Sequence, residues 1–328
     1  MRALPLLVAS AFLILTGILA AAGMPVMVSR SPQISVNVNV VTVPVTVTDS
    51  HGGFVSKLSR EDFRLLVDGS EQPIEYFSPE ETPAQVLILL ETGPAVYLLQ
   101  GEHVAAATDL LAGLGSGDRV AVASYGDAPQ LLLNFTTNKQ QAAFVLSSAN
   151  YGIGFANLNF YASLASALDW AASADGKNAI VVLTTGLDSS GPASWPQLED
   201  KMRGSNVMVV PVGLGGTLRD EAGRKNRSRI PNRDSGPPTG DELSFAESNR
   251  ALEAIAADTG GRAFFPRSAR DFADAYRRIA VLLRHQYSLG FTAAVSDGRY
   301  HSIQVGLTTG RPGRYRLNFR RGFLASTN

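Results

Sequence analysis

Gln85-Val-Leu-Ile-Leu-Leu-Glu-Thr-Gly-Pro-Ala-Val-Tyr97 is the stretch of the chain that decides its fold. The apolar run at 86–90 has the length and composition of a strand that is buried on both faces. The run ends in Glu91-Thr-Gly-Pro-Ala95, which carries a carboxylate, a flexible glycine and a proline suited to the first turn of a helix. Because ligands bind at the carboxyl ends of strands in an open α/β sheet, this turn is the first candidate for a binding site.

The region downstream of this turn alternates between strand and helix patterns. Apolar runs predict strands at 118–124, 130–135, 178–184, 207–212 and 262–265. Helical spacing predicts helices at 97–114, 139–148, 161–174, 195–203, 245–258 and 271–284. Such alternation favours a parallel-type sheet covered by helices on both faces. The basic segment 215–242 interrupts the pattern; we predict a flexible surface insertion there, with a basic binding segment as the alternative.

Both flanks of this α/β region show a period of two, which is typical of strands with one buried face. In 34–47 the phase changes at Val40-Val41, which predicts a bulge or a change of sheet, and Pro44 predicts an edge position. Asp68-Gly69 predicts a hairpin turn between strands at 63–67 and 73–77. Further strands are expected at 287–291, 303–307 and 315–319.

Neither flank is large enough to bury a core by itself, so we expect the two to pair. The prediction is an α/β domain inserted in a discontinuous antiparallel β-sandwich. The sandwich would comprise 33–82 and 285–323, and the α/β domain would comprise 83–284, including the insertion 215–242.

The N-terminus predicts export. Met1-Arg2 precedes a largely apolar segment that ends in the small residues Ala20-Ala-Ala22. This pattern is typical of a cleaved secretory signal peptide over 1–22, and an uncleaved membrane anchor is the alternative. We therefore expect a secreted, periplasmic or envelope protein, attached to a membrane only through this segment if it is not cleaved.

Composition excludes several function classes. A formal net charge of zero gives no global electrostatic basis for binding nucleic acid or an anionic membrane. The absence of cysteine excludes disulfides, thiol nucleophiles and cysteine–zinc sites. His51, His103, His285 and His301 lack the spacing of metal ligands, and no nucleophile elbow occurs. We therefore predict a protein that is not an enzyme; an envelope hydrolase is a minor alternative.

Several motifs, in order along nearly the whole mature chain, resemble the von Willebrand factor type A domain proteins of the bacterial "VWFA-related" family that is abundant in Acidobacteria. The matching stretches are Val43-Pro-Val-Thr-Val-Thr-Asp49, Leu58-Ser-Arg-Glu-Asp-Phe63, Val67-Asp-Gly69, Asp118-Arg-Val-Ala121, Thr259-Gly-Gly-Arg-Ala-Phe-Phe265, Gln286-Tyr-Ser-Leu-Gly-Phe291 and Arg320-Arg-Gly-Phe323. The resemblance implies that 83–284 forms a doubly wound von Willebrand type A-like domain.

The family usually holds a divalent cation at the turn after the first strand, in a metal-ion-dependent adhesion site. Its pattern is Asp-x-Ser-x-Ser after that strand, a threonine in a later loop and an aspartate after the fourth strand. The matching positions here are degenerate, since most carry no carboxylate or hydroxyl: Glu91, Gly93, Ala95, Leu158 and Thr185. Because magnesium prefers six oxygen ligands, we expect no Mg²⁺ or Mn²⁺ and no other cofactor.

We therefore predict an exported module that binds an unknown protein partner through the loops at the top of the sheet. The candidate contact residues are Glu91, Thr92, Tyr97, Phe155, Leu158, Phe160 and Asp188. The apolar residues of 152–160 would form a dry contact patch or fold back onto the core. A metal-dependent adhesion receptor that binds a cation at Glu91 is the alternative.

Overall fold

The computed structural model describes most of the chain from Val40 onward, and Val38–Asn328 forms one compact unit. The predicted signal peptide at 1–22 lies outside the described residues, as do Ala95, Tyr97, Phe155 and most of the predicted insertion 215–242. The described ranges are 40–51, 53–79, 83–93, 96, 100–151, 157–174, 176–189, 194–215, 240–308 and 314–327, with the backbone alone for 100–106 and 240–244.

A five-stranded sheet with the order β7-β6-β5-β8-β9 forms the centre of the α/β region. β5 is parallel to β6 and β8, and β8 is parallel to β9, whereas β7 runs antiparallel to β6 at one edge. Every residue of β5 is buried, which confirms the prediction of a central strand covered on both faces. The strands are β5 (Ala84–Glu91), β6 (Arg119–Tyr125), β7 (Pro129–Thr136), β8 (Lys177–Thr184) and β9 (Met208–Gly213).

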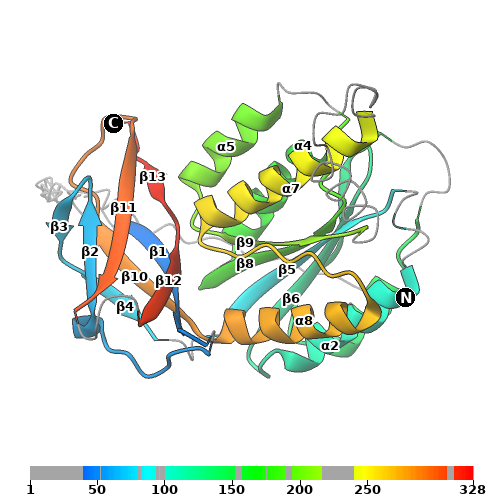
Figure 1. Cartoon of the computed structure of the whole chain (residues 1–328), viewed down its shortest axis with the longest axis horizontal. Coiled ribbons are helices and arrows are strands. Elements are labelled where there is room, and N and C mark those ends of the chain that lie inside the picture. Colours follow the sequence, from blue (N-terminus) through cyan, green and yellow to red (C-terminus); the bar gives the residue numbers. More distant parts are fainter. Residues whose placement is uncertain are drawn as a thin grey trace, which may run out of the picture. The chain divides into compact units, whose positions relative to one another are not determined.

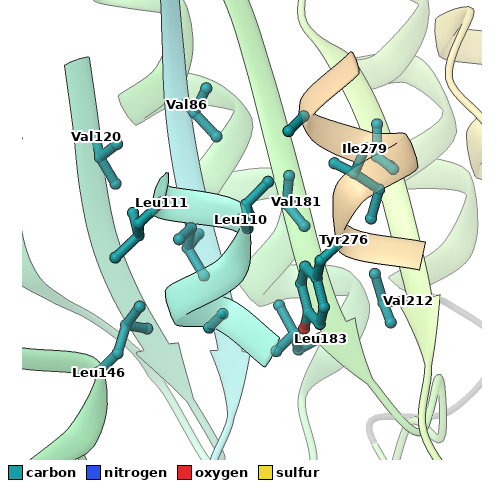
Figure 2. Packing of buried hydrophobic residues seen from close by; sticks show 14 of the residues in the cluster. Val86, Leu110, Leu111, Val120, Leu146, Val181, Leu183, Val212, Tyr276 and Ile279 are labelled. Atoms are coloured by element: carbon teal, nitrogen blue, oxygen red, sulfur yellow. The ribbon is translucent and has the colours of Figure 1, made fainter. Parts of the chain in front are cut away.

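Helices cover both faces of this sheet (Figure 1). Val86, Ile88 and Leu90 pack in one core with α2, α3 and α8, where Tyr276 and Ile279 lie over the sheet (Figure 2). Leu87 and Leu89 point to the opposite face and pack with α4, α5 and α7. The helices are α2 (Gln100–Gly113), α3 (Lys139–Ser147), α4 (Phe160–Ala172), α5 (Ser194–Gly204), α7 (Gly240–Thr259) and α8 (Ala269–Arg284). No described helix is long and apolar enough to cross a membrane.

The remaining strands form two four-stranded antiparallel sheets, ordered β12-β1-β10-β4 and β13-β11-β2-β3. Each sheet combines strands from both ends of the chain, and valines of β1, Phe63 and Leu65 of β2 and Phe291 of β10 share one core. The α/β region lies between β4 and β10 in sequence. These strands are β1 (Val40–Asp49), β2 (Phe63–Val67), β3 (Ser70–Gln72), β4 (Tyr76–Ser78), β10 (Gln286–Thr292), β11 (Tyr300–Leu307), β12 (Tyr315–Phe319) and β13 (Gly322–Leu324).

The structure confirms the predicted hairpin turn at Asp68-Gly69 and corrects its return strand. Asp68 and Gly69 both have positive φ angles of 47° and 80°, so the return strand begins at Ser70 rather than at Pro73. β4 overlaps the end of the predicted strand at 73–77, and it pairs with β10 in the other sheet. The predicted strand at 262–265 is reduced to a single bridge between Phe264 and Val212.

The edge position of Pro44 is confirmed. Pro44 pairs with Ser288 of β10, while the register of β12 on the other side of β1 begins only at Val45. A proline has no amide hydrogen to donate, and at this position one side of β1 requires none.

Candidate functional site

The site lies where three neighbouring strands of the five-stranded sheet end. Glu91 is the last residue of β5 and is the register partner of Tyr125, the last residue of β6. Thr184 ends β8, the neighbour of β5 on its other side, and Thr185 follows it. The parallel arrangement therefore brings a carboxylate, a phenol and two hydroxyls to one edge of the sheet.

These side chains enclose the Glu91 carboxylate, which has no exposed surface. Its Oε2 accepts hydrogen bonds from the Thr185 amide at 2.6 Å, the Tyr125 hydroxyl at 2.9 Å and the Thr185 hydroxyl at 2.9 Å. The Thr184 hydroxyl lies 3.1 Å from the same oxygen, and the Thr185 hydroxyl lies 3.0 Å from Oε1. The carboxylate is thus satisfied by donors that belong to the protein itself.

A second layer of hydrogen bonds holds these donors. The Gly186 amide donates to Thr184 Oγ1 at 2.7 Å, and the Tyr125 hydroxyl lies 2.5 Å from the same oxygen. The Ser248 hydroxyl of α7 donates to the Thr185 carbonyl at 2.6 Å. The donors around Glu91 are therefore linked to one another and to the surrounding backbone in one connected hydrogen-bond network.

Burial decides the electrostatics of the site. Removal from water raises the pKa of Glu91, and the hydrogen bonds from Thr185, Tyr125 and Thr184 act in the opposite direction by stabilising the charged form. Burial, followed by the nearby charge of Glu91, raises the pKa of Tyr125 well above its ordinary value. Tyr125 therefore keeps its proton and serves as a hydrogen-bond donor.

Leu158 and the Glu91 carboxylate both lie next to Gly93. A Cβ atom placed on Gly93 would lie 2.8 Å from Leu158 Cδ2 and 3.5 Å from Glu91 Oε1. Leu158 is held in turn by Ser189, whose hydroxyl accepts from the Leu158 amide at 3.1 Å and whose amide donates to the Leu158 carbonyl at 2.7 Å. A side chain at position 93 would have to displace this leucine.

The structure brings together four of the five predicted degenerate positions: Glu91, Gly93, Leu158 and Thr185. Ala95 lies outside the described residues. Sequence reasoning missed Tyr125 and Thr184. Both stand at the carboxyl end of a predicted apolar run, so a search for polar residues at all strand ends would have found them.

The predicted contact residues need correction. Glu91 and Phe160 have no exposed surface and Leu158 is 8% exposed, so none of the three can reach a partner in this conformation. Burial follows from their packing: Phe160 begins α4 and its ring lies 5.8 Å from that of Tyr125. The apolar loop residues Leu158 and Phe160 thus fold back onto the core.

Thr92 and Asp188 remain partly exposed, whereas Tyr97 and Phe155 lie outside the described residues. The Thr92 hydroxyl donates to the Tyr125 carbonyl at 3.0 Å. Asp188 accepts from the Tyr161 amide at 3.1 Å and lies 3.3 Å from the Ser194 hydroxyl. Both residues therefore shape the loops at this edge of the sheet.

No protein-family model and no curated protein matches the chain. Solved structures do match. An aerotolerance-related membrane protein of Bacteroides fragilis is 18% identical over 61% of this chain and 98% of its own, with a TM-score of 0.44. A von Willebrand factor type A structure from Catenulispora acidiphila is 12% identical over 89% and 75%, with a TM-score of 0.45.

The von Willebrand factor domain of the type V pilus tip protein Mfa5 of Porphyromonas gingivalis is 13% identical over 61% of this chain and 95% of its own, with a TM-score of 0.38. Several of the matching structures are thus von Willebrand factor type A domains, the family that the sequence motifs resemble.

Proposed function

We propose that this chain is an exported, non-enzymatic protein-interaction module whose strand-end site works without a metal ion. It would consist of a doubly wound von Willebrand type A-like domain inserted in a β-sandwich, with a vestigial adhesion site. One observation carries the proposal: Oε2 of the buried Glu91 lies within hydrogen-bond distance of donors on Tyr125, Thr184 and Thr185.

The donor set does not fit a divalent cation. Magnesium requires near-octahedral coordination by hard oxygens at about 2.0–2.1 Å. Among the described residues of this site, Glu91 offers the carboxylate, and the N–H and O–H groups of its neighbours already point at that carboxylate. The Leu158 methyl group next to Gly93 offers no lone pair. A cation would therefore have to displace several hydrogen bonds in exchange for one carboxylate and the neutral hydroxyl oxygens of Thr184 and Thr185.

His301 is not placed as the general base of a serine–histidine hydrolase. Its two ring nitrogens lie 2.7 Å from an Asp68 oxygen and 3.0 Å from an Asp297 oxygen. In a serine–histidine hydrolase a ring nitrogen of the histidine faces a hydroxyl nucleophile, whereas both nitrogens of His301 face carboxylates. The Ser302 hydroxyl, which is close by in sequence, donates to Asp68 at 2.9 Å instead.

Calorimetric titration with Mg²⁺ and with Mn²⁺ tests the metal-independent site. We expect millimolar cation to give the same heat with the natural protein, Glu91→Ala and the nearly isosteric Glu91→Gln. Circular dichroism would establish that both variants are folded. A cation-binding heat that disappears in both folded variants would establish the alternative, a metal-dependent adhesion receptor with Glu91 as a ligand.

The export proposal depends on the signal-like segment 1–22. Cell fractionation should find the full chain outside the cytoplasm and a chain without this segment inside it. Equal distribution of the two would contradict export. In the exported protein, a proximity-labelling group attached at the position of the partly exposed Thr92 or Asp188 would identify the partner that contacts this edge of the sheet.

A further inference from the structure

A cleft of about 550 Å³ lies between β1, β12 and α8, away from the site around Glu91. Arg262, Arg278 and Arg316 line it together with His51, and no acidic residue is among its described lining residues. Its volume falls in the range of small-molecule pockets, about 300–1,000 Å³. Its electrostatic character is that of an anion site.

The three arginines come from separate parts of the fold. Arg316 lies on β12, where it pairs with Thr48 of β1. Arg278 lies on α8, and Arg262 follows the end of α7. Convergence of like charges from three elements is not explained by the solvated face of a single strand or helix.

None of these arginines makes an ion pair with a carboxylate of the described residues. Their neighbours do: Arg277 pairs with Asp274 on the same helix, and Arg203 pairs with Glu199 at 2.6 Å. The guanidinium of Arg262 lies 5.5 Å from the centroid of the Phe264 ring, a contact that does not neutralise its charge. The cleft therefore carries positive charge that this part of the chain does not neutralise.

Apolar side chains make up part of the remaining lining, and hydrogen bonds hold Asn318 in place. Phe54, Phe264, Leu282 and Leu317 give the cleft apolar walls. Asn318 ties β12 to the loop before Arg262 by donating to the Gly260 carbonyl at 3.2 Å and to that of Gly261.

Thr46 also lines the cleft, and its buried hydroxyl has no hydrogen-bond partner among the described residues. A buried hydroxyl without a hydrogen-bond partner costs free energy. A ligand in the cleft that reached Thr46 would supply the missing hydrogen bond.

We propose that this cleft binds an oxyanion carried on an apolar body, either a carboxylate or a phosphate ester. Guanidinium groups bind both anions through paired N–H donors, and the aromatic and aliphatic walls would cover the apolar part of the ligand. This inference goes beyond the proposed function, since the cleft shares no residue with the network around Glu91.

Titration of the full chain with phenyl phosphate and with phenylacetate, at low ionic strength, tests the proposal. We expect one-to-one binding of at least one of them, and the tighter one identifies the preferred anion. Arg278→Gln and Arg316→Gln should each weaken it by about tenfold, because each removes charge-assisted hydrogen bonds. Matched controls are Arg277→Gln and Arg314→Gln, exposed arginines next to the cleft residues that do not line it.

Failure of both anions to bind at millimolar concentration would overturn the proposal, as would equal losses in the control variants. Benzyl alcohol binding as tightly as phenyl phosphate would refute recognition of the anion. Inorganic phosphate binding as tightly would refute the role of the apolar walls. None of these outcomes depends on the cation titration at Glu91, so the two proposals fail independently.

Discussion

Tyr125→Phe should destabilise the α/β domain by about 2 kcal/mol. The substitution keeps the ring and removes the hydroxyl that lies 2.9 Å from Glu91 and 2.5 Å from Thr184. Hydrogen bonds to charged groups contribute about 1.5–3 kcal/mol. Since the Thr185 amide and hydroxyl still reach the carboxylate, we expect a loss near the lower half of this range. The corresponding fall in Tm is about 4–8 °C.

Tyr276→Phe is the matched control. Tyr276 is as deeply buried as Tyr125, but its hydroxyl has no hydrogen-bond partner among the described residues. Its ring lies in the apolar core beside Leu183 (Figure 2). Removal of this hydroxyl should leave the free energy of unfolding unchanged or raise it slightly.

Urea unfolding followed by tryptophan fluorescence measures both effects. Trp170 and Trp195 are the two tryptophans of the chain, and both pack against the core on the α4 side of the sheet. The signal therefore reports on the domain that contains Glu91. Equal stabilities of Tyr125→Phe and the natural protein, or equal losses in the two variants, would refute the hydrogen-bonded enclosure of Glu91.

Two further predictions concern the strands outside the α/β region. Hydrogen bonds to Asp297 and Asp68 raise the pKa of His301, and the bond to His301 lowers the pKa of each aspartate. The raised histidine pKa gives stability that is lost as pH rises through its folded value, and the lowered aspartate values give stability that is lost as pH falls through theirs. The contribution of these bonds to the free energy of unfolding should therefore be greatest between about pH 4 and pH 6.5. The free energy of unfolding of His301→Gln, measured across this range, should lack this contribution. Arg320→Ala should lower the free energy of unfolding in urea by about 3 kcal/mol, because Arg320 is 2% exposed and donates to three acceptors. Arg321→Ala removes one side of a surface ion pair and should change this free energy by less than about 0.5 kcal/mol. Similar losses in both variants would contradict the role of Arg320.

Much of the fold follows from periodicity. The apolar run at 86–90 forms the central strand because only a strand covered on both faces buries every one of its side chains. The period of two in the flanks likewise predicts β10, β11 and β12. Periodicity does not give strand partners, however. The sequence therefore predicted strands at 63–67 and 73–77 without showing that β2 pairs with β3 and that β4 joins the other sheet.

The site shows the same limit. Motif comparison predicted Glu91, Gly93, Leu158 and Thr185 as matching positions, and the structure brings these residues together. It did not predict Tyr125, because the role of this residue depends on the adjacency of β5 and β6 and on the end of β6 one residue beyond the predicted strand. The sequence left open whether the apolar residues of 152–160 form a contact patch or fold back onto the core, and the burial of Leu158 and Phe160 favours the second alternative.

The length of the Glu91 side chain explains how its carboxylate reaches hydrogen-bond donors of the neighbouring strands. An aspartate at this position would withdraw its carboxylate by about one carbon–carbon bond, roughly 1.5 Å. The donors on Thr185, Tyr125 and Thr184 now lie 2.6–3.1 Å from Oε2, and such a withdrawal would take them beyond hydrogen-bond distance. The extra methylene therefore carries the carboxylate across to the donors at the ends of β6 and β8. Leu158 fills the space beside Gly93, and the single carboxylate of this turn acts as an internal tie between β5, β6 and β8.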